Sequence, residues 1–412
     1  MSKLQTTPSG WKLTTLGTFM EFKNGVNADK NAYGSGTEFV NVMDIFKRNF
    51  MKKCNILGKV EITEKQKAEY SVKYGDILFN RTSEVPDEIA FSSVYLDETE
   101  ITFGGFVIRG RQKKELLDPL FAGYCFNNSS IRREMIRRSQ GVVRANIGQK
   151  DLNKVPILIP PKDEQKKIAS VLALWDNAIE KTEALIAAKE KQFEWLMQSL
   201  ISKKCPDWNH YLARELFTGV SSKGHPDEEL LSVTQDQGVV PRSMLSGRVM
   251  SPAGSTAGYK LVEKGNFVIS LRSFQGGLEY SDYRGIVSPA YTVLSSRKEI
   301  HSGFYRHFFK SYIFIEKYLS VAVIGIRDGK QISSTDFETV KIPYPDMGEQ
   351  VKIASQLDTA RQEIDLLKGL LGKYRSQKRG LMQKLITGEW QVGSTQSISE
   401  GTLQELSKES VA

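Results

Sequence analysis

The stretch "PPKDEQKKIAS", residues 160–170, returns in altered form as "PDMGEQVKIAS" at residues 345–355. A shift of 185 positions lays residues 151–202 over residues 336–387 without a gap. Identical residues stand near both ends of this alignment as well as at its centre. Such agreement over a long ungapped stretch indicates a duplicated structural unit.

Each copy begins with prolines and then continues without them, as expected for an extended segment that enters a helix. In both copies apolar residues recur in alternating steps of four and three, which is the pattern of a coiled-coil seam. Each seam lasts about five heptads. The predicted seam and partner-binding positions are Ile168, Leu172, Trp175, Ile179, Ile186, Phe193, Leu196, Ile353, Leu357, Ile364, Leu367, Leu371, Tyr374 and Leu381.

The two seams are narrow and equal in length, so we predict that the two helices pack on each other. The alternative is that each helix packs only on the domain before it. Lys189 and Lys378 interrupt the seams. We hypothesise that these lysines mark places where a seam opens to receive a partner.

A globular block of mixed character precedes each helix, with short β-rich runs and turns that contain glycine. The two blocks also align with each other, Gly75 with Gly265 at nearly the same offset. We therefore expect an α/β (α+β) fold with two mixed domains, two long antiparallel coiled-coil helices and an internal pseudo-two-fold repeat. The predicted ranges are 1–155 for the first domain, 156–204 for the central helical spacer, 205–341 for the second domain, 342–390 for the C-terminal helical spacer and 391–412 for a flexible tail.

The composition is that of an ordinary globular protein with a moderate basic excess. Lysine and arginine number 57 against 48 aspartates and glutamates, a net charge of +9, which is compatible with nucleic-acid binding but does not require it. Three scattered cysteines give no disulfide framework, and no apolar run approaches the ~18 residues of a membrane span. We expect a cytoplasmic protein that does not associate with membranes.

A pseudo-two-fold molecule is suited to contact two places on another object of that symmetry, and double-stranded DNA is such an object. Arginine and lysine neutralise phosphates, and arginine, asparagine and glutamine can also pair with base edges. A solvated charged surface would carry the same residue types. The predicted DNA contacts are Asn80, Arg81, Thr82, Ser83, Arg109, Arg111, Arg144, Asn146, Gln149, Arg272, Ser273, Gln275, Arg284, Arg327, Lys330 and Gln331.

Motifs for catalysis are missing from the sequence. It has no phosphate-binding GxxxxGK[ST] loop, no HExxH or Cys/His zinc spacing and no strand-borne GxGxxG. We therefore predict no catalytic residues, no metal site and no cofactor bound by this chain. A coiled-coil adaptor that bridges two proteins without touching DNA is the alternative from another class.

The duplicated segments closely resemble the specificity (S) subunits of Type I restriction–modification enzymes. The residues that carry the resemblance are "DLNKVPILIPPKDEQKKIASVL", "LMQSLIS" and the second-half echo "VKIPYPDMGEQVKIASQLD" with "RGLMQKLITGEW". The globular blocks match the family only loosely, as expected for parts that differ with each target.

The resemblance implies two target recognition domains, each reading one half of a bipartite, asymmetric DNA sequence. The paired helices would set the gap between the halves and dock two methyltransferase (M) subunits, and restriction (R) subunits would join the assembled complex. The chain itself would be non-catalytic. S-adenosylmethionine, ATP and Mg²⁺ would be used by the partner subunits of this restriction endonuclease and adenine-N6 methyltransferase complex.

Overall fold

The computed structural model describes residues 7–46, 48–141, 144–245, 256–324 and 331–392. It divides into two compact units, each described here by itself. Unit 1 comprises the described residues of ranges 1–181 and 371–412, and unit 2 comprises those of range 182–370. The first predicted tail residues, 391 and 392, are described, and the rest of the tail lies outside the described residues.

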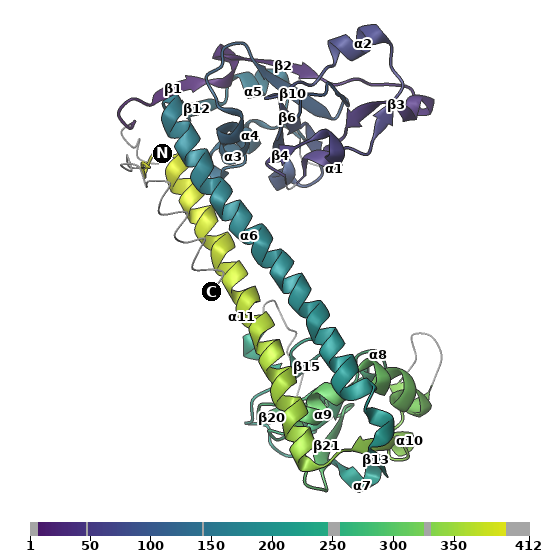
Figure 1. Cartoon of the computed structure of the whole chain (residues 1–412). Coiled ribbons are helices and arrows are strands. Elements are labelled where there is room, and N and C mark those ends of the chain that lie inside the picture. Colours follow the sequence, from purple (N-terminus) through teal and green to yellow (C-terminus); the bar gives the residue numbers. More distant parts are fainter. Residues whose placement is uncertain (1–6, 47, 142–143, 246–255, 325–330, 393–412) are drawn as a thin grey trace, which may run out of the picture. The chain divides into compact units, whose positions relative to one another are not determined.

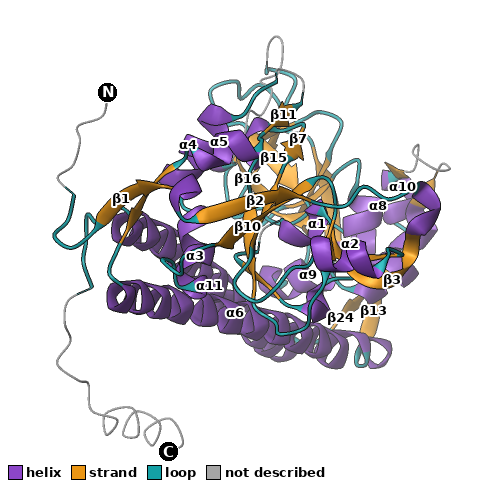
Figure 2. Ribbon diagram, turned by 90° about the horizontal axis from the view of Figure 1, so that it is seen from above, coloured by secondary structure: helices purple, strands orange, loops and turns teal. Residues whose placement is uncertain are grey.

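The main sheet of unit 1 has the strand order β2-β10-β6-β8-β4, and Figure 2 shows β2 beside β10. Neighbouring strands are antiparallel except β4 and β8. The strands of the unit are β1 Lys12–Thr15, β2 Met20–Asn24, β3 Tyr33–Val40, β4 Phe50–Met51, β5 Lys59–Val60, β6 Ile77–Asn80, β7 Thr82–Ser83, β8 Ser92–Tyr95, β9 Thr102–Phe103, β10 Val107–Gln112, β11 Ala145–Asn146 and β12 Pro156–Ile159.

Both faces of this sheet are buried, as the alternation along β6 shows. Ile77 and Phe79 enter a core shared with helices, whereas Leu78 between them enters a second core on the other face. The ring of Phe79 lies 5.2 Å from that of Phe126. The shorter helices of unit 1 are α1 Val42–Ile45, α2 Glu64–Glu69, α3 Pro119–Phe126, α4 Ser129–Arg138 and α5 Gln149–Asn153.

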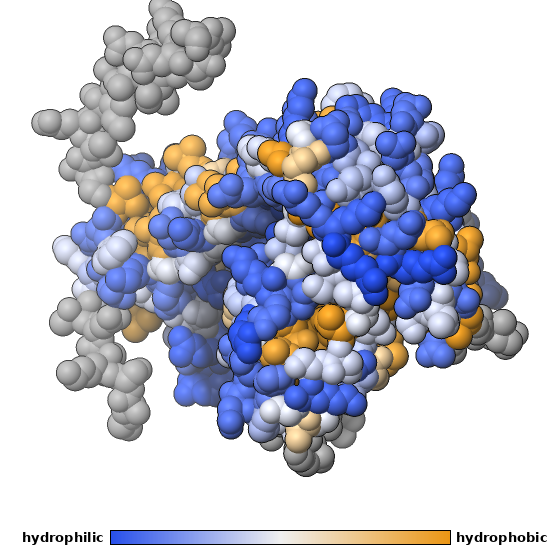
Figure 3. Space-filling model, turned by 90° about the horizontal axis from the view of Figure 1, so that it is seen from below, coloured by the Kyte–Doolittle hydropathy of each residue, from blue (hydrophilic) through white to orange (hydrophobic). Residues whose placement is uncertain are grey.

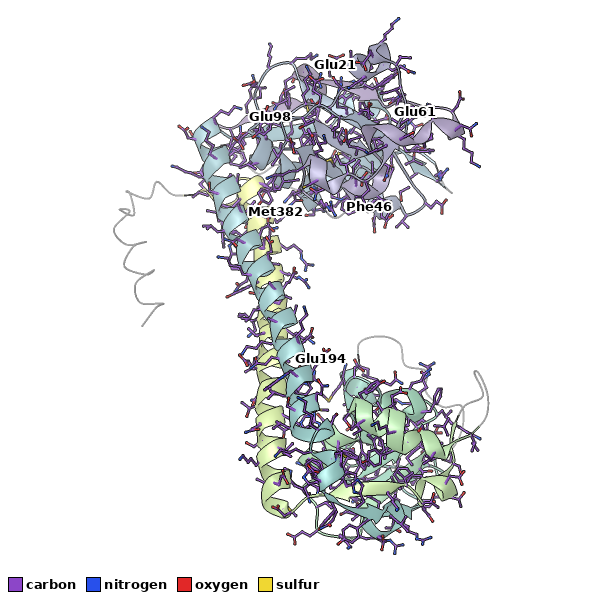
Figure 4. The ribbon with its side chains drawn as sticks, turned by 45° about the vertical axis from the view of Figure 1, so that its right-hand side comes forward. Glu21, Phe46, Glu61, Glu98, Glu194 and Met382 are labelled. Carbon is purple, nitrogen blue, oxygen red and sulfur yellow. The ribbon has the colours of Figure 1, made fainter. Side chains whose placement is uncertain are left out.

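The second core belongs to a smaller lobe built from β3, β9 and α1. It contains Val40, Ile45 and Phe103, which pack against the far side of the main sheet. Phe46, labelled in Figure 4, follows α1 directly and lies 5.5 Å from the ring of Phe91. With both faces of the sheet covered, the loops at the strand ends are suited to contact other molecules.

Unit 2 repeats this plan with a smaller sheet of order β14-β21-β18-β19. Its strands are β13 Asn209–Leu212, β14 Phe217–Val220, β15 Leu231–Thr234, β16 Gly238–Pro241, β17 Lys260–Val262, β18 Phe267–Ile269, β19 Glu279–Tyr280, β20 Gly285–Val287, β21 Thr292–Ser296, β22 Val323–Ile324, β23 Gln331–Ile332 and β24 Lys341–Tyr344. Its shorter helices are α7 Ala213–Leu216, α8 Ser273–Gly276, α9 Ser302–Phe308 and α10 Ser334–Phe337.

The predicted equivalence of Gly75 and Gly265 is visible in the turns that lead into β6 and β18. Their φ angles are +83° and +93°, in the left-handed region that favours glycine. Each glycine N–H donates across the sheet at 2.8 Å, to the carbonyl oxygens of Tyr95 and Ser281 respectively. In each globular part a turn of the same conformation therefore leads into the corresponding central strand, β6 or β18.

Two long helices, α6 Lys162–Met197 and α11 Met347–Ile386, each contribute one segment to unit 1 and one to unit 2 (Figure 1). Each helix follows a short strand, β12 or β24, which pairs antiparallel with the first strand of its unit, β1 or β13. None of the helices in the described ranges is apolar over a length that could cross a membrane.

The Glu-Gln pair of the repeated motif ties each long helix to its globular part. Glu164 accepts a hydrogen bond from the indole of Trp11, and Glu349 accepts one from Trp208, both at 2.9 Å. These two tryptophans stand at the start of the two blocks. The glutamate of each copy therefore anchors the beginning of its own domain to its own helix.

The glutamine of each pair is completely buried. The amide oxygen of Gln165 accepts from the N–H of Asp118 at 2.7 Å, and its nitrogen donates to the carbonyls of Leu116 (2.8 Å) and Pro160 (2.9 Å). Asp118 is the N-cap of α3. One side chain thus joins the start of a domain helix to the turn that enters the long helix.

Gln350 does the same in unit 2. It accepts from the N–H of His301, the N-cap of α9, and donates to the carbonyl of Pro345, both at 2.8 Å. The repeated motif is therefore the joint between each globular part and its supporting helix.

Within each unit the burial of the long helices follows the predicted seam. All of its positions are buried or half-buried, while most neighbouring helix positions are exposed. In unit 1 the rings of Trp175 and Tyr374 lie 5.7 Å apart, and in unit 2 Lys368 pairs with Glu190 at 2.7 Å. In the contacting pairs the residue number on α6 increases as the residue number on α11 decreases. The two helix segments are therefore antiparallel in each unit.

Both seam lysines are paired with carboxylates of the opposite helix. Lys189 contacts Glu363 at 2.8 Å. Lys378 forms an ion pair with Asp176, and its ammonium lies 5.4 Å from the centre of the Tyr124 ring. These pairs explain how a seam tolerates lysine, because the charge is neutralised across the helix pair. That a seam opens there for a partner stays a hypothesis.

A second contact joins each globular part to the helices. The hydroxyl of Tyr124 on α3 donates to Asp176 at 2.7 Å, and Nε2 of His307 on α9 donates to Asp358, also at 2.7 Å. The hydrogen bond from His307 holds the pKa of Asp358 below its ordinary value. On α4 the N-cap Asn128 adds a bond from its side chain to the carbonyl of Met382, labelled in Figure 4.

We predict that Gln165→Leu lowers the free energy of unfolding by about 3 kcal/mol, because it leaves one buried N–H and two buried carbonyls without partners. Thermal or denaturant unfolding of the whole chain measures this. The matched control is Gln192→Leu at an exposed position of α6, for which we expect little change. Equal effects of the two substitutions would show that the buried amide does not hold the joint.

Candidate nucleic-acid interface

In unit 1 two of the predicted basic stretches meet beyond the end of β6. β7 pairs antiparallel with β11, Ser83 opposite Ala145 and Thr82 opposite Asn146. The hydroxyl of Thr82 donates to the side-chain oxygen of Asn146 at 2.7 Å. We call residues 80–84 and 144–147 the corner of unit 1.

Two of the predicted contacts in this corner shape its backbone. Asn80 is completely buried; its amide nitrogen donates to the carbonyl of Glu88 at 3.1 Å, and its oxygen accepts from the N–H of Thr82 at 3.2 Å. Ser83 is also buried and donates to the Glu88 carboxylate at 3.1 Å. Both side chains bond within the turn, and a contact of either with DNA stays a prediction.

The remaining groups of the corner are accessible. Arg81 is half-buried and donates to the carbonyl of Gly105 at 3.2 Å. Arg144 is exposed, 3.6 Å from Glu84, and Asn146 is exposed. Gln149 at the start of α5 is half-buried, with its amide placed to donate to Phe22.

Unit 2 forms a corresponding corner beyond the end of β18, which we define as residues 270–275 and 331–332. The hydroxyl of the buried Ser273 accepts from the N–H of Ser270 at 2.8 Å and so shapes the turn. Arg272 and Gln275 are exposed on and beside α8. This helix packs on β23, where Gln331 is exposed. Gln331 occupies the position of Asn146 under the shift of 185 residues.

Lys310, which is not among the predicted contacts, supports this second corner. Its ammonium donates to the carbonyls of Gly276 (2.9 Å) and Gln235 (3.2 Å) and forms an ion pair with the buried Glu279. It therefore fixes the end of α8 to the sheet. A lone lysine after an aromatic run carries no sequence signal of such a role.

Arg109 and Arg111, which were also predicted as DNA contacts, bond to groups inside unit 1. Arg109 is 6% exposed, donates to the carbonyl of Ser71 and lies over the Phe103 ring, and burial lowers its pKa. Arg111 forms a two-fold contact with Asp76, at 2.8 and 2.6 Å, which raises the pKa of the arginine. Both act at the start of β6, whereas the corner follows its end.

The other predicted residues of unit 2 divide into two groups. Arg284 is half-exposed, but its guanidinium contacts Glu228 at 2.8 Å and also contacts Glu263. Arg327 and Lys330 lie outside the described residues. In the described part of the chain no cluster of histidine, cysteine, aspartate and glutamate is arranged to hold a metal ion. The face drawn in Figure 3 is mostly hydrophilic with scattered apolar patches.

The class of protein is defined by a match to a family model. The model of the Type I restriction modification DNA specificity domain matches residues 8–189 and 251–373, most of the chain. The chain therefore belongs to the family of Type I restriction–modification specificity subunits. This family is non-catalytic, which confirms the prediction that the chain is not itself an enzyme.

Similar proteins cover nearly the whole chain. A protein of Methanocaldococcus jannaschii named as the MjaX specificity subunit of a type I restriction enzyme is 24% identical over 93% of this chain and 95% of its own length. The MjaVIII specificity subunit of the same organism is 22% identical over 93% and 94%.

Solved structures show the same fold at lower identity. A chain from a study of complex assembly and conformational transition of the type I R-M system superposes with a TM-score of 0.60 at 17% identity, covering 94% of this chain and 100% of that chain. The HsdS subunit from Thermoanaerobacter tengcongensis gives 0.54 at 17% identity, covering 94% and 99%.

We predict that Arg111→Gln lowers the free energy of unfolding by about 2–3 kcal/mol, because it leaves the buried Asp76 carboxylate without its cation. The same variant should leave the recognised DNA sequence unchanged. Unfolding curves together with methylation mapping test both parts. An altered sequence preference at unchanged stability would return Arg111 to the set of DNA contacts.

Proposed function

We propose that this chain is the DNA sequence-recognition subunit of a Type I restriction–modification complex. The globular part of each unit, within the ranges 1–155 and 205–341 predicted as target recognition domains, would read one half of a bipartite, asymmetric target. Membership of the specificity-subunit family supports this proposal. The names of the M. jannaschii relatives agree with it.

The observation that carries the proposal is the pair of corners. Each corner consists of two segments: the one that follows the central strand of its sheet, β6 or β18, and the one that precedes α5 or α10. The backbone plan is shared, but the accessible side chains are unlike. They are the half-buried Arg81 and the exposed Arg144 and Asn146 in one corner, and the exposed Arg272, Gln275 and Gln331 in the other. Two corners with the same backbone arrangement and different side chains suit the recognition of two different half-sites.

These side chains suit DNA because each can act in a groove or along the backbone. A guanidinium pairs with both acceptors of guanine, and an amide pairs with adenine. Phosphate contacts position the protein, while base contacts specify the sequence. We assign the accessible corner residues to these contacts, together with the adjacent Gln149. Arg284 is a separate candidate, because its ion pair with Glu263 places it near the turn before β18. We leave out Asn80, Ser83, Arg109 and Ser273, which are buried, and Arg111, which is bound to the buried Asp76.

The long helices would serve two further roles. Their continuous seam would set the gap between the half-sites, and their outer faces would dock two methyltransferase subunits, with restriction subunits joining the assembly. S-adenosylmethionine, ATP and Mg²⁺ would be used by those partners. The complex would act in the cytoplasm, where DNA is accessible. The exposed face of α6, on which Figure 4 labels Glu194, carries polar side chains compatible with a protein partner.

We predict that Arg272→Ala costs about 1–3 kcal/mol in binding of the specific target and relaxes the sequence requirement in one half-site only. Because Arg272 is exposed, the free energy of unfolding should hardly change. Titration of the chain with its methyltransferase subunits onto target and scrambled duplexes measures the effect, and repetition over a range of salt concentrations measures the phosphate contribution.

The matched control is Arg214→Ala, which removes the same charge from an exposed position of α7 outside the corner. An equal loss of affinity on both duplexes for Arg272→Ala would make it a phosphate contact. A wild-type complex that binds both duplexes equally, or neither, would contradict the proposed function itself.

A further inference from the structure

Phe106 is the exposed exception in a buried stretch of unit 1. Every other residue from Ile101 to Gly110 is buried, yet the Phe106 side chain is 62% exposed. The phenylalanine stands at the tip of the turn that joins β9 to β10. The ring forgoes the burial that stabilises its neighbours and is accessible for a contact outside the chain.

The turn that carries Phe106 is held rigidly. The N–H of Gly104 donates to the carbonyl of Val40 at 3.0 Å, that of Gly105 donates to Val26 at 2.9 Å, and that of Val107 closes the turn on Gly104 at 2.8 Å. The two glycines also leave no space for a side chain, because a Cβ on Gly104 would meet the Phe39 ring. The ring is therefore presented by a fixed backbone.

The same turn is bonded to the corner of unit 1. The N–H of Arg81 donates to the carbonyl of Phe106 at 2.9 Å, and the Arg81 guanidinium donates to Gly105 at 3.2 Å. The carbonyl of Arg81 in turn accepts from Ile147 at 3.0 Å, in the segment that carries Arg144 and Asn146. An exposed apolar ring and the exposed polar groups of the corner thus share one rigid framework.

We propose that Phe106 is a specificity-determining residue whose ring packs on the 5-methyl group of a thymine in the half-site read by unit 1. This rests on the proposed function. The exposed Arg144 of the corner would supply hydrogen bonds to base edges, as would Asn146 once its amide exchanges its bonds to Thr82 and to the carbonyl of Arg144. The major groove distinguishes all four base pairs by such bonds. The apolar group on a base edge in that groove is the thymine methyl, and it is what an aromatic ring beside those donors can recognise.

The test combines a protein change with a DNA change. The whole chain with its methyltransferase subunits is titrated onto its target duplex and onto duplexes in which each thymine of the half-site is replaced, one at a time, by deoxyuridine. For the wild-type chain, one replacement should weaken binding about tenfold. For Phe106→Ala, binding to the unmodified target should already be about tenfold weaker, and the same replacement should have no further effect.

Two controls keep the result interpretable. Leu57→Ala truncates another side chain of unit 1 that is 89% exposed and lies outside the corner, and it should leave binding and the uridine effect unchanged. Unfolding curves of Phe106→Ala should match the wild type, because the removed ring is exposed. Phe106→Leu should retain part of the discrimination.

The possible outcomes distinguish a failure of the thymine-methyl contact from a failure of the proposed function. A wild-type complex that prefers its target but loses no affinity with any uridine replacement would overturn the methyl contact and leave the proposed function intact. A Phe106→Ala variant that stays as sensitive to uridine as the wild type would do the same. Loss of all preference between target and scrambled DNA in the wild type would remove the proposed function and this inference together.

Discussion

The two fully buried amides of Gln165 and Gln350 are the interactions on which the arrangement of each unit depends. Each amide bonds at once to the cap of a domain helix and to the proline turn that enters a long helix. Since a buried polar group without partners is costly, the orientation of the domain on its helix is restricted to one that satisfies both sides. The adjoining glutamates anchor the first tryptophan of each domain to the same helix turn.

The residues that join each domain to its helix are distinct from the residues proposed to recognise DNA. The tryptophan, glutamate and glutamine of the joint are the same in both halves, whereas the exposed corner residues beyond β6 and β18 differ. The side chains at the corners can change without disturbing the buried joint, because no joint residue lies in a corner. A protein that must read different sequences with a constant partner assembly benefits from such a division, and this is what the proposed function requires.

The seam and the repeat could be predicted from the sequence because they rest on local periodicity. Heptad spacing places Ile168 and Leu172 on one helix face whatever the surroundings, and the structure confirms that they are buried. The role of the seam lysines depends on Glu363 and Asp176 of the opposite helix, which periodicity alone does not reveal. The hydrogen bonds of the Glu-Gln pair could not be predicted from the periodicity either, because their partners lie in the globular part.

Which of the candidate DNA contacts are buried could not be predicted from the sequence, because composition does not report burial. Arg109 and Arg272 both follow a β-rich run, yet one lies inside unit 1 and the other is exposed in unit 2. Arginine is read as a surface residue unless a buried partner such as Asp76 or a backbone carbonyl is known. Phe106 shows the opposite placement, because its apolar side chain and strand-like neighbours are typical of a core position and yet it is exposed.

The central claim is that two different recognition domains are held by duplicated joints and helices. Its most direct test is a map of methylated adenines in DNA from cells that express this chain with its methyltransferase subunits. The account predicts one motif made of two different half-sites, separated by a gap of fixed length and free sequence. A palindromic or uninterrupted motif, or the absence of any motif in cells where the complex assembles, would contradict it.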